Sequence, residues 1–399
     1  MQPLRRFWRD NSVLGASTAA AGVANWLYAV VLAHRLGPVA FGDVSVLNNM
    51  VVVLMLPASV VTLVATRTGR TGVRWRRAAG WRWLAGGMLW LIPALLNRRL
   101  GSALHVPSGL LWVWPLAAFP IMDYAANVGY LQRARQYGRV GGLAVGGSLA
   151  AVGAAGVAAV VPHRLLVLGT LQALLAGGLW AFSACWATRL TPQPNLPEGR
   201  AVLLPAIAGT LGSLLTLTDS IVAKARFSPL TAGHYTGLAT IGQAVPFVAG
   251  ALATVLLTAV LDHPGDSRRW LARTLMLYGA LAGGADILFL AAPDAVVRVA
   301  LGSAFLPISG LLPLYGAGMT GLGTVLILLA FAVARHRWAG VWPVMLGWTG
   351  WVLWLAREPT LPGLVTATAV TMLTTLAMQG VALGLVAGSE TGRTQRRYG

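Results

Sequence analysis

Twelve long apolar runs constrain this chain more than any other feature of its sequence. A helix needs about 20 mostly apolar residues to cross a bilayer, and the lipid interior admits only helices or closed barrels. The runs are continuously apolar rather than alternating, so they predict helices and an all-α membrane protein. They cover residues 13–36, 43–66, 79–97, 108–130, 140–161, 165–188, 201–223, 233–261, 270–292, 308–333, 341–356 and 362–387.

The positions of the cationic residues predict how these helices are oriented. If the N-terminus lies in the cytoplasm, 22 of the 30 Lys and Arg residues fall on the cytoplasmic side and 8 on the outer side. Membrane proteins concentrate Lys and Arg in their cytoplasmic loops. We therefore predict an N-in, C-in protein of the inner (cytoplasmic) membrane. The net charge of +19 reflects this orientation signal rather than a nucleic-acid surface, because the arginines lie in short groups between apolar runs.

A duplicated turn predicts that the chain consists of two repeats. The spacing Arg, Pro, Gly occurs twice at an offset of 191 residues, as Arg35, Pro38 and Gly42 and as Arg226, Pro229 and Gly233. Each copy follows the first apolar run of a half. Six helices per half would make both halves start in the cytoplasm, which is the arrangement of parallel repeats. We predict six-helix lobes at 1–190 and 201–399, joined by the proline-containing cytoplasmic linker 191–200.

Three segments resemble a known family in their order and spacing. They are AHRLGPVAFGDVSVLNNMVVVLMLPAS (Ala33 to Ser59), TDSIVAKARFSPLTAGHYTGLATIGQAV (Thr218 to Val245) and VVRVALGSAFLPISGLLPLYG (Val296 to Gly316). They are similar to motifs of the polysaccharide-biosynthesis flippases in the multidrug/oligosaccharidyl-lipid/polysaccharide exporter superfamily. The segments cover under a fifth of the chain. Val39, Ala40 and Phe41 depart from the acidic or aromatic pair that this family carries in the first turn.

The resemblance implies a MATE-like fold and a transport function. Such proteins move undecaprenyl-diphosphate-linked oligosaccharides across the membrane by alternating access between two six-helix lobes. The implied partners are the lipid-linked sugar, membrane lipids, and polysaccharide polymerases or glycosyltransferases. Three other functions stay open: a multidrug or cation antiporter on the same scaffold, a membrane glycosyltransferase or ligase, and a non-transporting scaffold for polysaccharide enzymes. The short outer loops disfavour the glycosyltransferase.

Asp123 is the first candidate for ion coupling. It lies ten residues before Arg133, which places it about 15 Å along the predicted helix and near the middle of the membrane core. Asn127 lies one turn further on, on the same face. The pair predicts either a proton or cation relay or a clamp to another helix, since an ionisable group is costly within a membrane. For a relay, Asp123→Asn should abolish ion-dependent transport with little change in stability.

Two repeat-related helices each carry a polar stripe with a cation at the predicted outer end. Thr216, Asp219 and Arg226 share one face of the helix at 201–223, with Lys224 close by, and Asn25, Tyr28 and Arg35 hold the equivalent positions in the helix at 13–36. We predict Arg35, Arg226, Lys224, Asn25 and Tyr28 as substrate-binding residues, because guanidinium groups bind phosphate oxygens in pairs. The alternatives are that Asp219 only neutralises a neighbouring cation and that the arginines only reach toward the interface.

Signals of catalysis and of cofactor binding are missing from the sequence. The six histidines are scattered without metal-ligand spacing, and the single Cys185 excludes a cysteine cluster and a disulfide framework. No Walker P-loop and no Ser/His/Asp set is present. We therefore expect no catalytic residues, no metal and no cofactor, and a protein that is not an enzyme.

Overall fold

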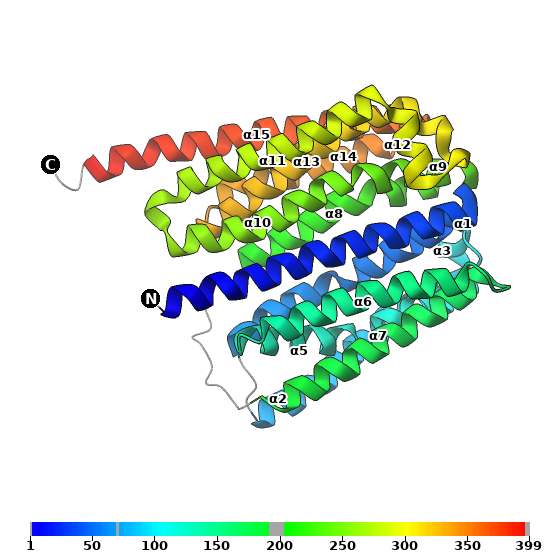
Figure 1. The fold of residues 1–399 in the computed structure, drawn as a ribbon, viewed down its shortest axis with the longest axis horizontal. Helices are drawn as coiled ribbons and strands as arrows, with labels where there is room; N and C mark the ends of the chain where they lie inside the picture. Colours follow the sequence, from blue (N-terminus) through cyan, green and yellow to red (C-terminus); the bar gives the residue numbers. More distant parts are fainter. Residues whose placement is uncertain (1, 69–71, 191–202, 396–399) are drawn as a thin grey trace. The chain divides into compact units, whose positions relative to one another are not determined.

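The computed structural model describes residues 2–68, 72–190 and 203–395, and side chains in the parts of these ranges between 15 and 384. The described residues form α-helices and short 3₁₀ helices, without a strand among them (Figure 1). The predicted all-α class is confirmed. The linker predicted at 191–200 lies outside the described residues.

The first helix, α1 (Gln2–Thr68), contains two of the predicted membrane segments and the turn between them. It is interrupted at Gly37, whose φ of 71° falls in the left-handed region that glycine adopts without a steric penalty. Pro38 follows directly and cannot donate a backbone hydrogen bond, so the helical ladder breaks at this point. The predicted break between 13–36 and 43–66 is therefore a kink made by Gly37 and Pro38.

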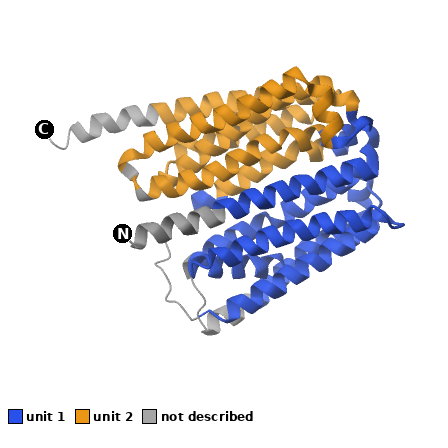
Figure 2. Cartoon of the chain, viewed as in Figure 1, with its two compact units in different colours: residues 1–206, 223–237, 301–305 blue, residues 207–222, 238–300, 306–399 orange. Residues whose placement is uncertain are grey.

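Two compact units divide the chain (Figure 2). The first contains residues 1–206, 223–237 and 301–305, and the second contains 207–222, 238–300 and 306–399. Residues 203–206, 223–237 and 301–305 of the C-terminal half thus belong to the unit that contains the N-terminal half. Helices α8 (Leu203–Arg226) and α9 (Pro229–Gly242) each contribute residues to both units. The lobe boundaries predicted at 190 and 201 stay a prediction.

In the first unit, α1 packs against α5 and α6, and α7 packs against α5 and α6. The middle of this unit is more broken than the sequence predicts. A single helix was expected over 108–130, but the chain there changes from α-helix to 3₁₀ helix and back, with Pro115 and Pro120 at the breaks. Besides α1, the elements are α2 (Gly72–Leu95), α3 (Asn97–Leu104), α4 (Leu110–Val113), η1 (Trp114–Ala118), α5 (Ile121–Arg133), α6 (Tyr137–Ala158) and α7 (Arg164–Thr188).

In the second unit, α13 is the central helix and packs against α10, α11 and α15. Glycines on α13 allow these close contacts; a Cβ at Gly318, for example, would come 2.7 Å from the Cα of Ala369 on α15. The elements are α10 (Ala244–Asp262), η3 (Pro264–Asp266), α11 (Ser267–Ala291), α12 (Pro293–Leu301), η4 (Ser303–Leu311), α13 (Leu312–Ala334), η5 (Trp338–Gly340), α14 (Trp342–Leu355) and α15 (Leu361–Gln395).

Eight helical stretches of the described residues are long and apolar enough to cross a membrane. One of them, Gly15–Thr66, has 52 residues and holds two predicted segments. The segments predicted at 79–97, 108–130 and 341–356 are not among the eight. The last of these forms α14, whose 14 residues span about 21 Å against a core of about 30 Å. The stretches support a multi-pass membrane protein, while the number of twelve is not confirmed.

The predicted N-in, C-in topology can be tested by labelling. In a Cys185→Ser background, which removes the single exposed thiol, Ser102→Cys should react with a membrane-impermeant maleimide on intact cells. Gly265→Cys should react only after the cells are permeabilised. Both positions are exposed, and a Cβ at Gly265 would meet no atom within 4 Å. The reverse pattern of labelling would overturn the orientation.

Candidate functional site

The two copies of the repeated turn pack against each other within the first unit. A Cβ at Gly42 would come 2.9 Å from the Cα of Gly233, and a Cβ at Gly233 would collide with the carbonyl oxygen of Pro38. Gly42 and Gly233 are equivalent positions of the two predicted repeats. The duplicated glycine therefore serves a backbone contact that a larger residue would block.

The close contact at Gly233 predicts that adding one methyl group there destabilises the protein. Gly233→Ala should lower the free energy of unfolding by about 1–3 kcal/mol, since overpacking moves the backbone. Gly250→Ala is the matched control: it also lies in a helix, but its Cβ would meet no atom within 4 Å. There alanine should be neutral or stabilising by up to about 1 kcal/mol. Equal thermal midpoints of the two purified variants would contradict the contact.

A buried ion pair lies beside this contact. The Lys224 Nζ is 2.5 Å from Oδ1 of Asp43, and the lysine side chain is fully buried. The carbonyl oxygen of Lys224 is 3.2 Å from Nδ1 of His105. Lys224 was predicted as a substrate-binding cation at the outer rim, but in this structure its ammonium is paired with a carboxylate from the other copy of the repeated region. Asp43 was not singled out from the sequence, although it follows Gly42 directly.

Arg35 and Arg226, the two predicted clamp residues, are both exposed. Each lies three residues before the proline of its turn. The carbonyl oxygen of Arg35 accepts a hydrogen bond of 3.0 Å from Nη1 of Arg164 at the start of α7. Both arginines belong to the first unit.

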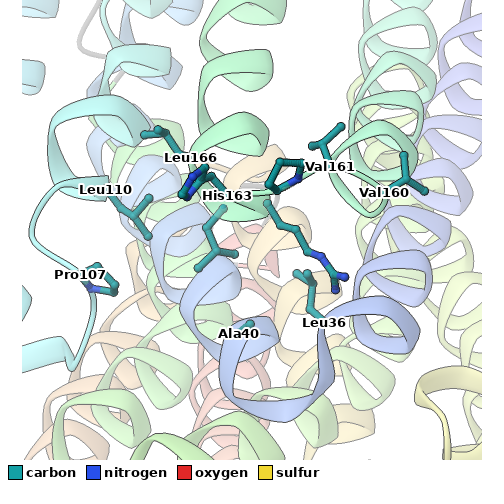
Figure 3. A pocket seen from close by; sticks show the side chains of 11 residues that line it. Leu36, Ala40, Pro107, Leu110, Val160, Val161, His163 and Leu166 are labelled. Atoms are coloured by element: carbon teal, nitrogen blue, oxygen red, sulfur yellow. The ribbon is translucent and has the colours of Figure 1, made fainter.

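A cavity in the first unit borders the same region (Figure 3). It has a volume of about 650 Å³, and most of its lining is apolar, including Leu36, Ala40 and Leu110. His163 and Arg164 supply its polar groups. An apolar wall with a few polar groups at one side is typical of sites for amphipathic molecules.

The hydroxyl of Tyr28 belongs to a hydrogen-bond network within the protein. Its hydroxyl accepts hydrogen bonds from Gln172 Nε2 at 2.5 Å and from Asn48 Nδ2 at 3.1 Å. Trp114 Nε1 donates to the other atom of the Asn48 amide at 3.0 Å. Asn25, its predicted companion, is exposed. Asn48 and Gln172 were not predicted as site residues, although a side-chain amide within an apolar run is a signal of a contact between helices.

Asp123 lies at the centre of a buried polar cluster. Its Oδ1 is 2.7 Å from both Nε and Nη2 of Arg82 on α2. Its Oδ2 accepts from Trp180 at 3.0 Å and from Asn127 at 3.4 Å, and Asn127 also donates to Ser183 at 3.3 Å. The cluster joins α2, α5 and α7. The predicted proximity of Asp123 and Asn127 is therefore observed. Of the two roles predicted for this pair, the contacts correspond to a clamp between helices.

The helix break before Asp123 contributes to its environment. Asp123 lies in the first turn of α5, which begins after Pro120, rather than in the middle of a continuous helix. Backbone N–H groups at a helix start favour a negative charge. Arg82 is one of the 22 cationic residues that the topology prediction assigns to the cytoplasmic side, but it is 9% exposed and paired within the protein. Its signal was present in the sequence: an ionisable residue within an apolar run has a partner in most membrane proteins.

Asp219 occupies a separate position, in the second unit. It is 1% exposed, its Oδ2 accepts a 2.6 Å hydrogen bond from the hydroxyl of Tyr315, and its Oδ1 accepts one from the backbone N–H of Ser220. Nearby, the backbone carbonyl of Thr216 accepts from Gln243 Nε2 at 2.6 Å. Asp219 and Thr216, two residues of the polar stripe predicted on this helix, thus form hydrogen bonds with other residues of the second unit.

No protein-family profile and no curated protein sequence matches the chain. Solved structures do match. A multidrug resistance MATE family transporter of the MOP superfamily, in an inward-facing conformation, superposes with a TM-score of 0.72 and 12% identity, over 93% of this chain and 96% of that one. The lipid II flippase MurJ, inward closed, gives 0.72 and 11%, over 93% and 87%.

A third structure is similar over an equally large share of the chain. A MOP superfamily transporter from Pyrococcus furiosus gives a TM-score of 0.56 and 14% identity, over 95% of both chains. Identities this low show a common fold. The predicted MATE-like fold is confirmed at this level: the chain has the fold shared by MATE transporters and the lipid II flippase MurJ.

Proposed function

We propose that this protein translocates an anionic, lipid-linked substrate across the cytoplasmic membrane by alternating access, as a transporter and not an enzyme. The observation that carries the proposal is the state of the buried carboxylates in the first unit. Asp43 is paired with Lys224 and Asp123 with Arg82. A carrier of organic cations needs a carboxylate that is available to its substrate, and both carboxylates are neutralised within the protein.

The exposed charges near the repeated turns support an anionic substrate further. Arg35 and Arg226 are both exposed, and Arg35 directly precedes Leu36, which lines the apolar cavity. A guanidinium group binds phosphate oxygens in a bidentate manner. The substrate class proposed is undecaprenyl-diphosphate-linked oligosaccharide, in cell-surface polysaccharide biosynthesis. In this account Arg35 and Arg226 hold the diphosphate, while the turns at Pro38 and Pro229 separate and close during the cycle.

The two arginines can be tested directly. Arg35→Gln and Arg226→Gln should each reduce export of lipid-linked sugar at least tenfold, with partial recovery in the Arg→Lys variants, because lysine keeps the charge but not the bidentate geometry. The double variant should be little worse than either single variant if both side chains bind one group. Arg357→Gln is a matched control, since this arginine is also exposed.

Export can be measured as the fraction of lipid-linked sugar accessible at the outer surface of spheroplasts. Cells lacking the protein should accumulate the sugar on the cytoplasmic side. Normal export in both Arg→Gln variants, at normal membrane levels, would leave the repeated turn as an architectural element only.

A cation antiporter is the second candidate, and the second unit supplies the observation that favours it. The buried carboxylate of Asp219 accepts a hydrogen bond from the hydroxyl of Tyr315. Oδ1 of Asp286 is buried without a hydrogen-bond partner, while its Oδ2 accepts a hydrogen bond from Thr320. Such carboxylates are suited to carry protons or cations. This function predicts that Asp286→Asn abolishes ion-driven efflux of a cationic dye, whereas the lipid-linked substrate predicts no such efflux in the wild-type protein.

A further inference from the structure

A basic cavity in the second unit shares no residue with the candidate functional site. It has a volume of about 310 Å³ and is formed by residues of α11, α13 and α15 together with the turn that follows α13. Three arginines line it: Arg268 near the start of α11, and Arg335 and Arg337 after the end of α13. None of its lining residues is acidic. A cavity with three cationic side chains and no carboxylate favours an anionic ligand.

Apart from Ser267 and the three arginines, the residues that line the cavity are apolar or glycine. Leu271, Leu328 and Leu383 line it on three different helices. Gly380 and Gly384 lie one turn apart on α15, and a Cβ at either position would meet no atom within 4 Å. The two glycines therefore leave an open strip along α15 beside the leucines. The shape joins a cationic end to an apolar groove, which suits a molecule with a phosphate head and a hydrocarbon tail.

The predicted topology places the cationic end at the cytoplasmic side. The three arginines belong to the loops that the charge distribution assigns to the cytoplasm. The cytoplasmic leaflet carries anionic lipids, and basic pockets between membrane helices on this side bind anionic head groups. We infer that this cavity is a binding site for an anionic phospholipid, with its phosphate on Arg268, Arg335 and Arg337 and an acyl chain along Gly380 and Gly384. The inference does not depend on the transported substrate.

The test measures lipid retention by the purified full-length protein. Wild-type protein in detergent should retain phosphatidylglycerol in native mass spectra, in preference to phosphatidylcholine. The triple variant Arg268→Gln/Arg335→Gln/Arg337→Gln should bind it roughly a hundredfold more weakly, because each arginine near an anionic head group contributes about 1 kcal/mol. The control Arg269→Gln/Arg298→Gln/Arg357→Gln removes the same charge from exposed arginines outside the cavity and should bind as the wild type does.

A second variant tests the groove without changing any charge. Gly384→Leu should fill the space beside Leu383 and weaken phosphatidylglycerol binding at least tenfold, whereas Gly250→Leu, at an equally open helical position on α10, should not. Equal retention by the triple variant and its control would overturn the site. Binding of inorganic phosphate as tightly as the lipid, with no effect of Gly384→Leu, would overturn the lipid as the ligand and leave a phosphate site. Size-exclusion profiles establish that each variant is folded.

Discussion

Replacing Lys224 by methionine should lower the free energy of unfolding by about 3–5 kcal/mol, because it leaves the buried carboxylate of Asp43 without its partner. The pair is closely spaced, at 2.5 Å, and the lysine side chain is fully buried. Neither charge can recover its hydration where it lies. Asp43→Asn should have a comparable cost, since it leaves the ammonium unpaired. The measurement is the thermal midpoint of the purified protein, together with its level in the membrane.

The double variant Asp43→Leu/Lys224→Met separates the pair from the packing around it. Replacing a buried ion pair by apolar residues of similar volume is often neutral or stabilising, so the double variant should be more stable than either single one. If Lys224→Met is as stable as the wild type, or if the double variant is no better than the single ones, the pair does not hold the repeated turns together.

The second large effect is expected at Asp123. The sequence alone predicts that Asp123→Asn changes stability little. The structure reverses this expectation, because Arg82 is buried against the carboxylate and would keep an uncompensated charge. We now expect a loss of about 3–5 kcal/mol in the free energy of unfolding, and a partial recovery when Arg82→Met is combined with Asp123→Leu.

Transport by the double variant Arg82→Met/Asp123→Leu then distinguishes between the two functions predicted for the cluster. If the cluster only clamps α2, α5 and α7, Arg82→Met/Asp123→Leu should transport at close to the wild-type rate. If Asp123 relays an ion, the stable double variant should be inactive. Wild-type stability of Asp123→Asn alone would contradict the ion pair.

The sequence indicated one residue of each ion pair, Lys224 and Asp123, but it did not indicate which residues they pair with. Lys224 and Asp123 are ionisable groups within or beside apolar runs, which makes them candidates without any structure. Their partners, Asp43 and Arg82, lie 181 and 41 residues away in the chain. Which charges meet depends on how the helices pack, and hydropathy contains no information on this. Arg82 was instead counted as a cytoplasmic charge.

The predictions about the helices succeeded where long apolar runs decide the structure and failed where prolines do. The runs at 140–161, 165–188 and 270–292 form α6, α7 and α11 with nearly the expected ends. The run at 108–130 is also long enough to span a membrane, but Pro115 and Pro120 break it. The repeated Pro and Gly of the turns were recognised as a repeat; that the two glycines touch could not be predicted, since it depends on the packing of segments 191 residues apart.

Reconstitution of the purified protein into vesicles with a fluorescent undecaprenyl-diphosphate-linked sugar tests the proposed function most directly. A membrane-impermeant quencher reports how fast the labelled lipid reaches the outer leaflet. We expect wild-type protein and Arg357→Gln to accelerate this transfer over protein-free vesicles, and Arg35→Gln/Arg226→Gln to fall to near the protein-free rate. Transfer no faster than in protein-free vesicles, with ion-driven uptake of a cationic dye by the same preparation, would contradict the account and identify a cation antiporter instead.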